Sequence, residues 1–142
     1  MGANRSFSKL LEPTAIGQMT VRNRIYMSPM ADRYGIDGYV MEKQKFYYEA
    51  RAKGGTGLVV IGASCVDFPL GMSDSFHTYL DDDKFIPGLT ELAAGIKKHG
   101  ARAAIELNHA GPRAQSDLQP VSPSGCGIQP SCPIQGPRRQ PA

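Results

Sequence analysis

The sequence predicts an α/β fold, and specifically the first part of a (β/α)8 TIM barrel. Candidate strands alternate with candidate helices along the chain, an order that is typical of parallel sheets with helical crossovers. Residues 58–63 (LVVIGA) are apolar at nearly every position, as expected of a parallel strand buried on both faces. A complete barrel takes about 250 residues, so the 142 residues of this chain can hold only its first strands.

The hairpin and the first strand are predicted at the beginning of the chain. Residues 10–21 contain two short apolar runs on either side of the turn formers Gly17-Gln18, which predicts a small hairpin. Residues 24–28 then predict a short strand, which ends at Pro29 because proline has no N–H to donate to a ladder. Residues 31–39 are rich in aspartate and glycine, which indicates a loop.

Two helices are predicted after this loop. Residues 41–53 contain good helix formers and no proline or glycine, and Gly54-Gly55 ends this helix. Three aspartates at 81–83 begin the second helix, where their charge suits the helix dipole, and Pro87 falls in its first turns. Helical spacing predicts a buried face made of Ile86, Leu89, Ala93 and Ile96.

The last predicted strand covers residues 102–108, and the composition changes after it. Residues 115–142 are rich in proline and glutamine and contain no aromatic residue. Such a segment cannot bury enough apolar surface to offset the entropy lost on ordering. We therefore divide the chain into a barrel part, residues 10–113, and an irregular or disordered tail, residues 114–142.

Composition and charge exclude several classes of protein. The chain is 41% hydrophobic and 20% charged, with a formal net charge of +3. That charge is small and unclustered, so we expect no nucleic-acid partner. No apolar run approaches the roughly 18 residues of a membrane helix, so we expect no membrane partner.

The cysteines and the first residues bear on metal binding and compartment. Cys65, Cys126 and Cys132 are too few for a disulfide framework, and no histidine lies near the last two, so we expect no metal site. The chain does not begin with a charged segment followed by an apolar one, as a secretory signal does. Together these features predict a cytoplasmic protein.

The carboxyl ends of the three predicted strands are the candidate functional site, because barrel enzymes carry their sites there. The first strand is followed by residues 28–31, the second ends at 62–64, and the third at 106–111. Small residues at two of these ends suit a flat ring lying against the main chain. A purely structural role is the alternative, with His109 capping a loop and Glu106 facing water.

A glycine-rich run, residues 54–57, does not indicate a dinucleotide site. The fingerprint for such a site follows a strand and opens a helix. This run instead ends a helix and leads into a strand, so a helix cap accounts for it.

Several blocks of the sequence, in the same order, resemble the motifs of the Old Yellow Enzyme family of FMN-dependent NAD(P)H:flavin oxidoreductases. Residues 23–30 (NRIYMSPM) resemble its N-R-I-x-M-(A/S)-P-M pattern, and residues 48–58 its Y-x-x-R-A-x-G-G-x-G-L pattern. Residues 105–111 (IELNHAG) resemble x-Q-L-x-H-x-G-R. Residues 11–17 and 120–124 also agree with the family. In having an asparagine, Asn108, before His109, the chain resembles the enoate and 2,4-dienoyl-CoA reductase branch of the family.

This resemblance implies a barrel that holds FMN, is reduced by NAD(P)H and passes hydride to a small activated alkene. It further implies that the flavin is lined by the main chain and side chains of the residues after the first strand, which are Ser28, Pro29, Met30 and Ala31. Ala63 would touch the edge of the ring. Glu106 would hydrogen-bond its pyrimidine side. The resemblance also implies a catalytic role for Tyr34, facing the substrate.

Three departures from the family pattern leave a second hypothesis open, and one of them is Pro112, which displaces Arg113 by one position in the H-x-G-R motif. Glu106 stands where the family usually has glutamine, and an ionised carboxylate accepts hydrogen bonds but donates none. The substrate-binding residues of the fourth strand and the phosphate site after strands seven and eight have no counterpart here. The alternative is a truncated or frameshifted fragment without activity in isolation, and a partner chain is one way to complete the barrel. A small flavodoxin-like domain would need a phosphate loop after the first strand, which residues 28–30 do not supply.

Overall fold

The computed structural model describes residues 7–114. The N-terminal elements are a short helix, a β-hairpin and a two-residue strand: α1 (Ser8–Leu11), β1 (Thr14–Ile16), β2 (Met19–Val21) and β3 (Tyr26–Met27). The remaining elements are α2 (Glu42–Lys53), β4 (Leu58–Cys65), a 3-10 turn (Asp83–Phe85), α3 (Ile86–Lys98), β5 (Arg102–Asn108) and a second 3-10 turn (Gly111–Arg113).

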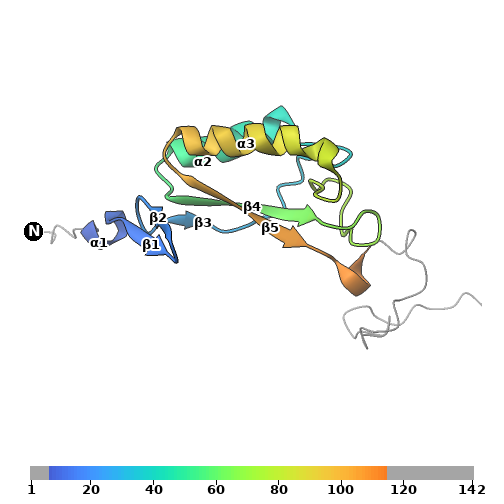
Figure 1. Ribbon diagram of the computed structural model, residues 1–142, viewed down its shortest axis with the longest axis horizontal. Helices are drawn as coiled ribbons and strands as arrows, with labels where there is room; N and C mark the ends of the chain where they lie inside the picture. The colour runs from blue at the N-terminus through green and yellow to red at the C-terminus, as the bar shows by residue number, and fades with distance from the viewer. Residues whose placement is uncertain (1–6, 115–142) are drawn as a thin grey trace, which may run out of the picture.

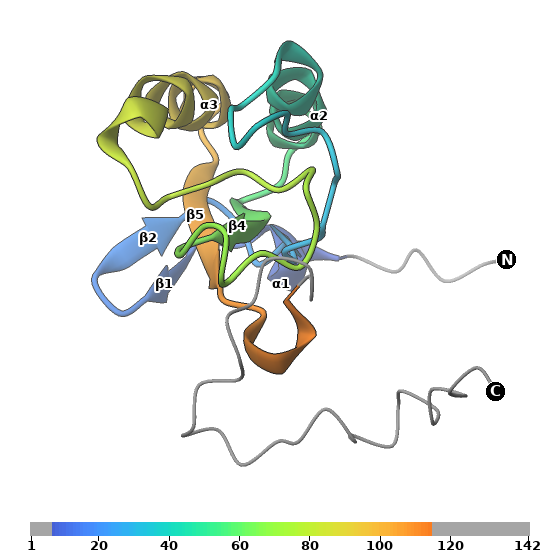
Figure 2. The same ribbon diagram turned by 90° about the vertical axis from the view of Figure 1, so that its right-hand side faces the viewer.

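Strands β3, β4 and β5 form a parallel sheet in that order, with β4 in the centre. Tyr26 pairs with Leu58 and Leu58 with Arg102, which sets the register at the amino ends of the strands. Helices α2 and α3 connect the strands and lie side by side on one face of the sheet (Figures 1 and 2). The predicted β–α–β–α–β order and the hairpin at residues 14–21 are therefore confirmed.

The core lies between this sheet and the two helices. Side chains on α2 and α3 pack onto the side chains of β4 that point toward them, and the buried members are Tyr48, Ala52, Val59, Ile61, Leu92, Ile96 and Ala101. In the described part of the chain no helix covers the opposite face of the sheet (Figure 2). No helix among residues 7–114 is both long enough and apolar enough to span a membrane.

Arg22 joins the hairpin to the ends of both long helices. One guanidinium nitrogen donates to the carbonyl of His99 at 2.5 Å, and the other donates to the carbonyls of Ala52 and Thr56 at 2.7 and 2.9 Å. The last carbonyls of a helix lack intrahelical partners and lie at the negative end of its dipole. One side chain thus satisfies the carboxyl ends of α2 and α3 together.

The second helix begins later than predicted, and its buried face is shifted. The aspartates at 81–83 precede α3: only Asp83 belongs to the 3-10 turn, and Asp82 caps that turn by accepting a hydrogen bond from the Lys84 N–H at 2.9 Å. Phe85 at the end of this turn takes the buried place, so Ile86 points outward and is 54% exposed. Leu92 and Ile96 are the buried residues of the helix, and the prediction for Ile86 is wrong.

Smaller differences concern the ends of elements and the tail. Strand β4 continues to Cys65, beyond the predicted end at residue 63, because Cys65 still pairs with Asn108 of β5. Helix α1 was not predicted from the sequence. The predicted tail, apart from Ala114, lies outside the described residues, as do Cys126 and Cys132.

Candidate functional site

Three chain segments meet at the carboxyl edge of the parallel sheet. Residues 28–31, here called the 28–31 segment, follow β3, while Ala63 and Glu106 lie near the ends of β4 and β5. Parallel strands bring their carboxyl ends to one edge, which is where α/β proteins bind ligands. The topology therefore gathers the residues singled out in the sequence, apart from Tyr34, into one region.

The 28–31 segment lies directly on the end of β4. A Cβ added to Gly62 would overlap the main-chain nitrogen and oxygen of Met30, so a side chain cannot be accommodated at this position. The Gly62 N–H donates to the Tyr48 hydroxyl of α2 at 3.1 Å. The side chain of Met30 points away from this contact and is 56% exposed.

Ala63 and Glu106 are in direct contact. Ala63 has a φ of 45°, a left-handed conformation that is rare for residues with a side chain, at the irregularity in the β4–β5 register between Ile61 and Ser64. This turns its N–H sideways, where it donates to Glu106 Oε2 at 2.8 Å. Among the described residues no other donor reaches the Glu106 carboxylate, so Oε1 is free to accept a hydrogen bond from a ligand.

Tyr34 lies against α2. Its ring meets that of Tyr47 edge-on, with 5.5 Å between the centroids, and the Lys43 ammonium lies 4.3 Å from the Tyr34 ring centroid. The Tyr34 N–H donates to Asp32 Oδ1 at 2.9 Å. The structure thus places Tyr34 with the helix, and its catalytic role stays a prediction. Ser28 and Ala31 are exposed and Pro29 is half-buried.

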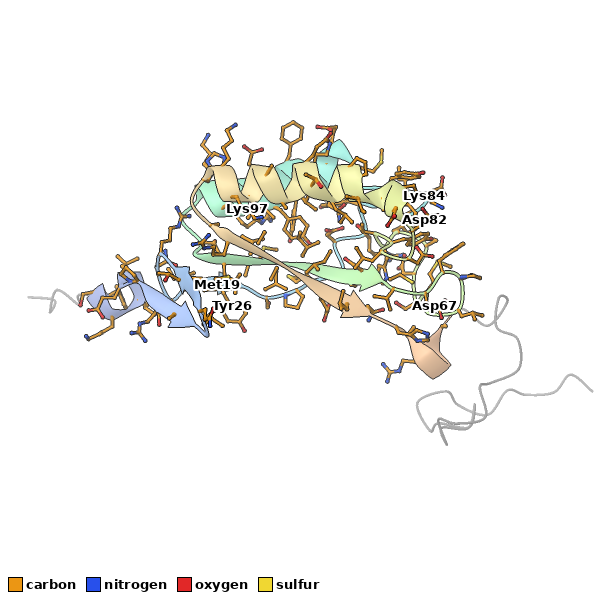
Figure 3. The ribbon with its side chains drawn as sticks, viewed as in Figure 1. Met19, Tyr26, Asp67, Asp82, Lys84 and Lys97 are labelled. Atoms are coloured by element: carbon orange, nitrogen blue, oxygen red, sulfur yellow. The ribbon has the colours of Figure 1, made fainter. Side chains whose placement is uncertain are left out.

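His109 joins two loops at this edge. Its Nδ1 accepts a hydrogen bond from the Gly111 N–H at 3.0 Å, which leaves the proton on Nε2, 3.3 Å from Asp67 Oδ2. Asp67 belongs to the loop after β4 and lies at the carboxyl end of the sheet in Figure 3. This geometry agrees with the alternative in which His109 stabilises a loop.

His77, in the loop after β4, is a buried titratable residue that the sequence did not indicate. It is 6% exposed, and its Nδ1 lies 3.5 Å from Ser73 Oγ. Burial lowers the pKa of the imidazole, and the nearby Asp74 carboxylate partly opposes this effect. A histidine in a long loop without a motif gives no sequence signal of burial, so only the tertiary structure reveals it.

Tyr48, whose hydroxyl accepts the Gly62 N–H, is fully buried. Burial is the main cause that raises the pKa of Tyr48, so its phenol stays protonated. Within residues 7–114 no three His, Cys, Asp or Glu side chains come together in a group that could hold a metal ion.

A family model and curated relatives match most of this chain. The model described as the NADH:flavin oxidoreductase / NADH oxidase family matches residues 9–137. An NADH oxidase from Thermoanaerobacter brockii is 40% identical over 123 residues, which is 83% of this chain and 19% of the relative. An NADPH dehydrogenase from Listeria monocytogenes is 38% identical over 120 residues, 82% of this chain and 35% of the relative. The chain thus spans well under half the length of these relatives.

Solved structures agree with this assignment. A 2-naphthoyl-CoA reductase in complex with 2-naphthoyl-CoA superposes with a TM-score of 0.74 at 28% identity, covering 78% of this chain and 17% of the other. The old yellow enzyme from Trypanosoma cruzi superposes with a TM-score of 0.69 at 25% identity, covering 83% of this chain and 32% of the other. The chain belongs to the NADH:flavin oxidoreductase / NADH oxidase family, which is the Old Yellow Enzyme family.

Proposed function

We propose that this chain supplies the flavin-contacting first strands of an FMN-dependent oxidoreductase that takes hydride from NAD(P)H and passes it to a small activated alkene of the enoate or dienoyl type. Membership of the family supports the flavin and the nicotinamide reductant. A neighbouring structure that is a 2-naphthoyl-CoA reductase supports a conjugated substrate. Further strands are needed to close the barrel beyond β5, and in this proposal another segment, such as a partner chain, supplies them.

The observation that carries the proposal is the arrangement of the 28–31 segment, Ala63 and Glu106 at the carboxyl edge. Gly62 lets the main chain of Met30 lie flat on β4. Ala63 has a small side chain, and in this proposal the edge of the planar ring lies against it. The free oxygen of Glu106 is an acceptor for the N3–H group on the pyrimidine edge of the flavin. The residues present therefore fit the flavin ring.

The chemistry that bound FMN supplies is transfer of a hydride from NAD(P)H to the alkene. The residues of this chain bind and orient the ring. The 28–31 segment supports it through main-chain contacts, and Glu106 fixes its pyrimidine edge. Tyr34 is proposed to face the substrate from the loop after β3.

A fluorescence titration of FMN with the full chain and with Glu106→Gln tests the proposal. Saturable quenching is expected for both. In the variant the amide oxygen can accept the Ala63 N–H while its Nε2 donates to a flavin carbonyl, so about tenfold tighter binding is expected for this variant. The absence of quenching with either protein would refute flavin binding by these strands and favour the inactive-fragment hypothesis.

A further inference from the structure

We infer that Gln44 and Asp32 are positioning residues that hold the 28–31 segment in place on β4. Gln44 lies on α2 and Asp32 lies immediately after the segment. The consequence for cofactor affinity rests on the proposed function, whereas the positioning itself does not.

The carboxamide of Gln44 joins three parts of the chain. Gln44 is 1% exposed, which is unusual for a glutamine. Its Nε2 donates to Asp32 Oδ2 at 2.9 Å and to Thr78 Oγ1 at 3.1 Å, and the Thr78 hydroxyl lies 3.3 Å from Gln44 Oε1. The loop after β3, helix α2 and the loop after β4 are thereby held together through one side chain.

Asp32 and Tyr48 add further contacts next to the segment. Oδ1 of Asp32 accepts the Tyr34 N–H at 2.9 Å, which fixes the turn that follows the segment. Tyr48 lies four residues after Gln44, on the same face of α2, and the negative charge of Asp32 adds to the effect of burial in raising the Tyr48 pKa. The Tyr48 hydroxyl in turn accepts the N–H of Gly62, the residue on which Met30 lies.

Polar contacts fix this segment because its own side chains bury little surface. Ser28, Met30 and Ala31 are exposed, so apolar burial contributes little to their position. Buried hydrogen-bonding groups require partners with defined geometry, so the Gln44–Asp32 contact specifies one arrangement of the loop. Binding of a rigid planar ring depends on such pre-organised contacts.

Amide hydrogen exchange measured by NMR on the full chain tests the positioning. Gln44→Met keeps the length of the side chain and its helix propensity but removes the hydrogen bonds. We expect the Tyr34 amide to exchange at least about tenfold faster, with the β4–β5 ladder unchanged. Gln18→Met is the matched control, because Gln18 is exposed in the hairpin turn, and it should leave the Tyr34 rate unchanged. An unchanged Tyr34 rate in Gln44→Met would overturn the inference.

A double-mutant cycle on FMN affinity tests whether Gln44 acts through Asp32. Asp32→Ala is the second variant. Because Asp32 is half-buried in a loop and Gln44 is fully buried, this substitution should disturb the fold less than one at Gln44. Each single change should weaken FMN about tenfold, and the double variant should also lose about tenfold, not a hundredfold. Additive losses would overturn the coupling. If the wild-type chain does not bind FMN, the proposed function fails, while the Tyr34 exchange rate still decides the positioning.

Discussion

Replacement of Arg22 by alanine should destabilise the chain more than any other single arginine replacement in the hairpin region. Arg22 is half-buried and donates to carbonyls of Ala52, Thr56 and His99 over 2.5–2.9 Å. Ala52 and His99 lie at the ends of α2 and α3, and Thr56 lies shortly after α2, so the change removes a partner from two helix ends at once. It also frees the hairpin from the helices.

The expected loss follows from the three contacts. A hydrogen bond from a charged donor contributes about 1.5–3 kcal/mol, and a cation at a helix carboxyl end adds about 0.3–1 kcal/mol. The three hydrogen bonds share one guanidinium, so their contributions are not additive. The Nε atom of Arg22 is buried without a partner among the described residues, and this cost offsets part of the stabilisation. We expect the free energy of unfolding to fall by about 3 kcal/mol, a large share of the stability of a small domain.

Urea unfolding followed by circular dichroism measures this loss. Arg24→Ala is the matched control, since Arg24 is exposed and its side chain makes no hydrogen bond or ion pair within the described residues; its loss should stay below about 0.5 kcal/mol. Arg22→Lys keeps the charge without the planar fork and should lose about half as much as Arg22→Ala. Equal midpoints for Arg22→Ala and Arg24→Ala would show that the helix-end contacts do not stabilise the fold.

Three further predictions concern single residues. Gly62→Ala should destabilise the chain by about 1–3 kcal/mol in urea unfolding, because the added Cβ would overlap the main chain of Met30. Gly95→Ala in α3 should be neutral or stabilising, because the nearest atom to its added Cβ lies 3.7 Å away. Equal effects of the two changes would contradict the overlap. The hydrogen bond from His99 lowers the pKa of Glu49. The stability that this ion pair contributes is therefore present above the ordinary carboxyl pKa and is lost as the pH falls through the lowered pKa. Glu49→Gln should flatten this part of the curve of stability against pH, and an unchanged curve would contradict the contribution of the pair. Burial raises the pKa of the Cys65 thiol, so iodoacetamide should label Cys65 only in the unfolded chain. Peptide mass mapping measures this labelling, and rapid labelling of Cys65 in the native chain would contradict its burial.

Local sequence signals predicted the elements that depend on local interactions. Gly17 has a φ of 59°, as the predicted hairpin turn requires, and the apolar run after Gly57 forms the central strand. The helix predicted over residues 41–53 ends at Gly54, as its glycine pair indicates. The residues that the motif resemblance assigns to the flavin, namely 28–31, 63 and 106, lie together at the carboxyl edge of the sheet.

Other features depend on contacts between distant residues and gave no local signal. Arg22 contacts carbonyls 30, 34 and 77 residues further along the chain, so no window around it predicts its role. Gln44 lies in a helix rich in polar residues, and its burial is set by two loops that fold over it. The left-handed conformation of Ala63 arises from the β4–β5 register, since alanine itself does not favour it.

The most direct test of the central claim, that the carboxyl edge of the sheet contacts flavin, is an FMN titration followed by amide chemical shifts. We expect saturable shifts for the amides of Ala31 and Ala63, with Thr20 in the hairpin at the opposite end unaffected. Shifts confined to the hairpin, or none at Ala31 and Ala63 at saturating FMN, would contradict it.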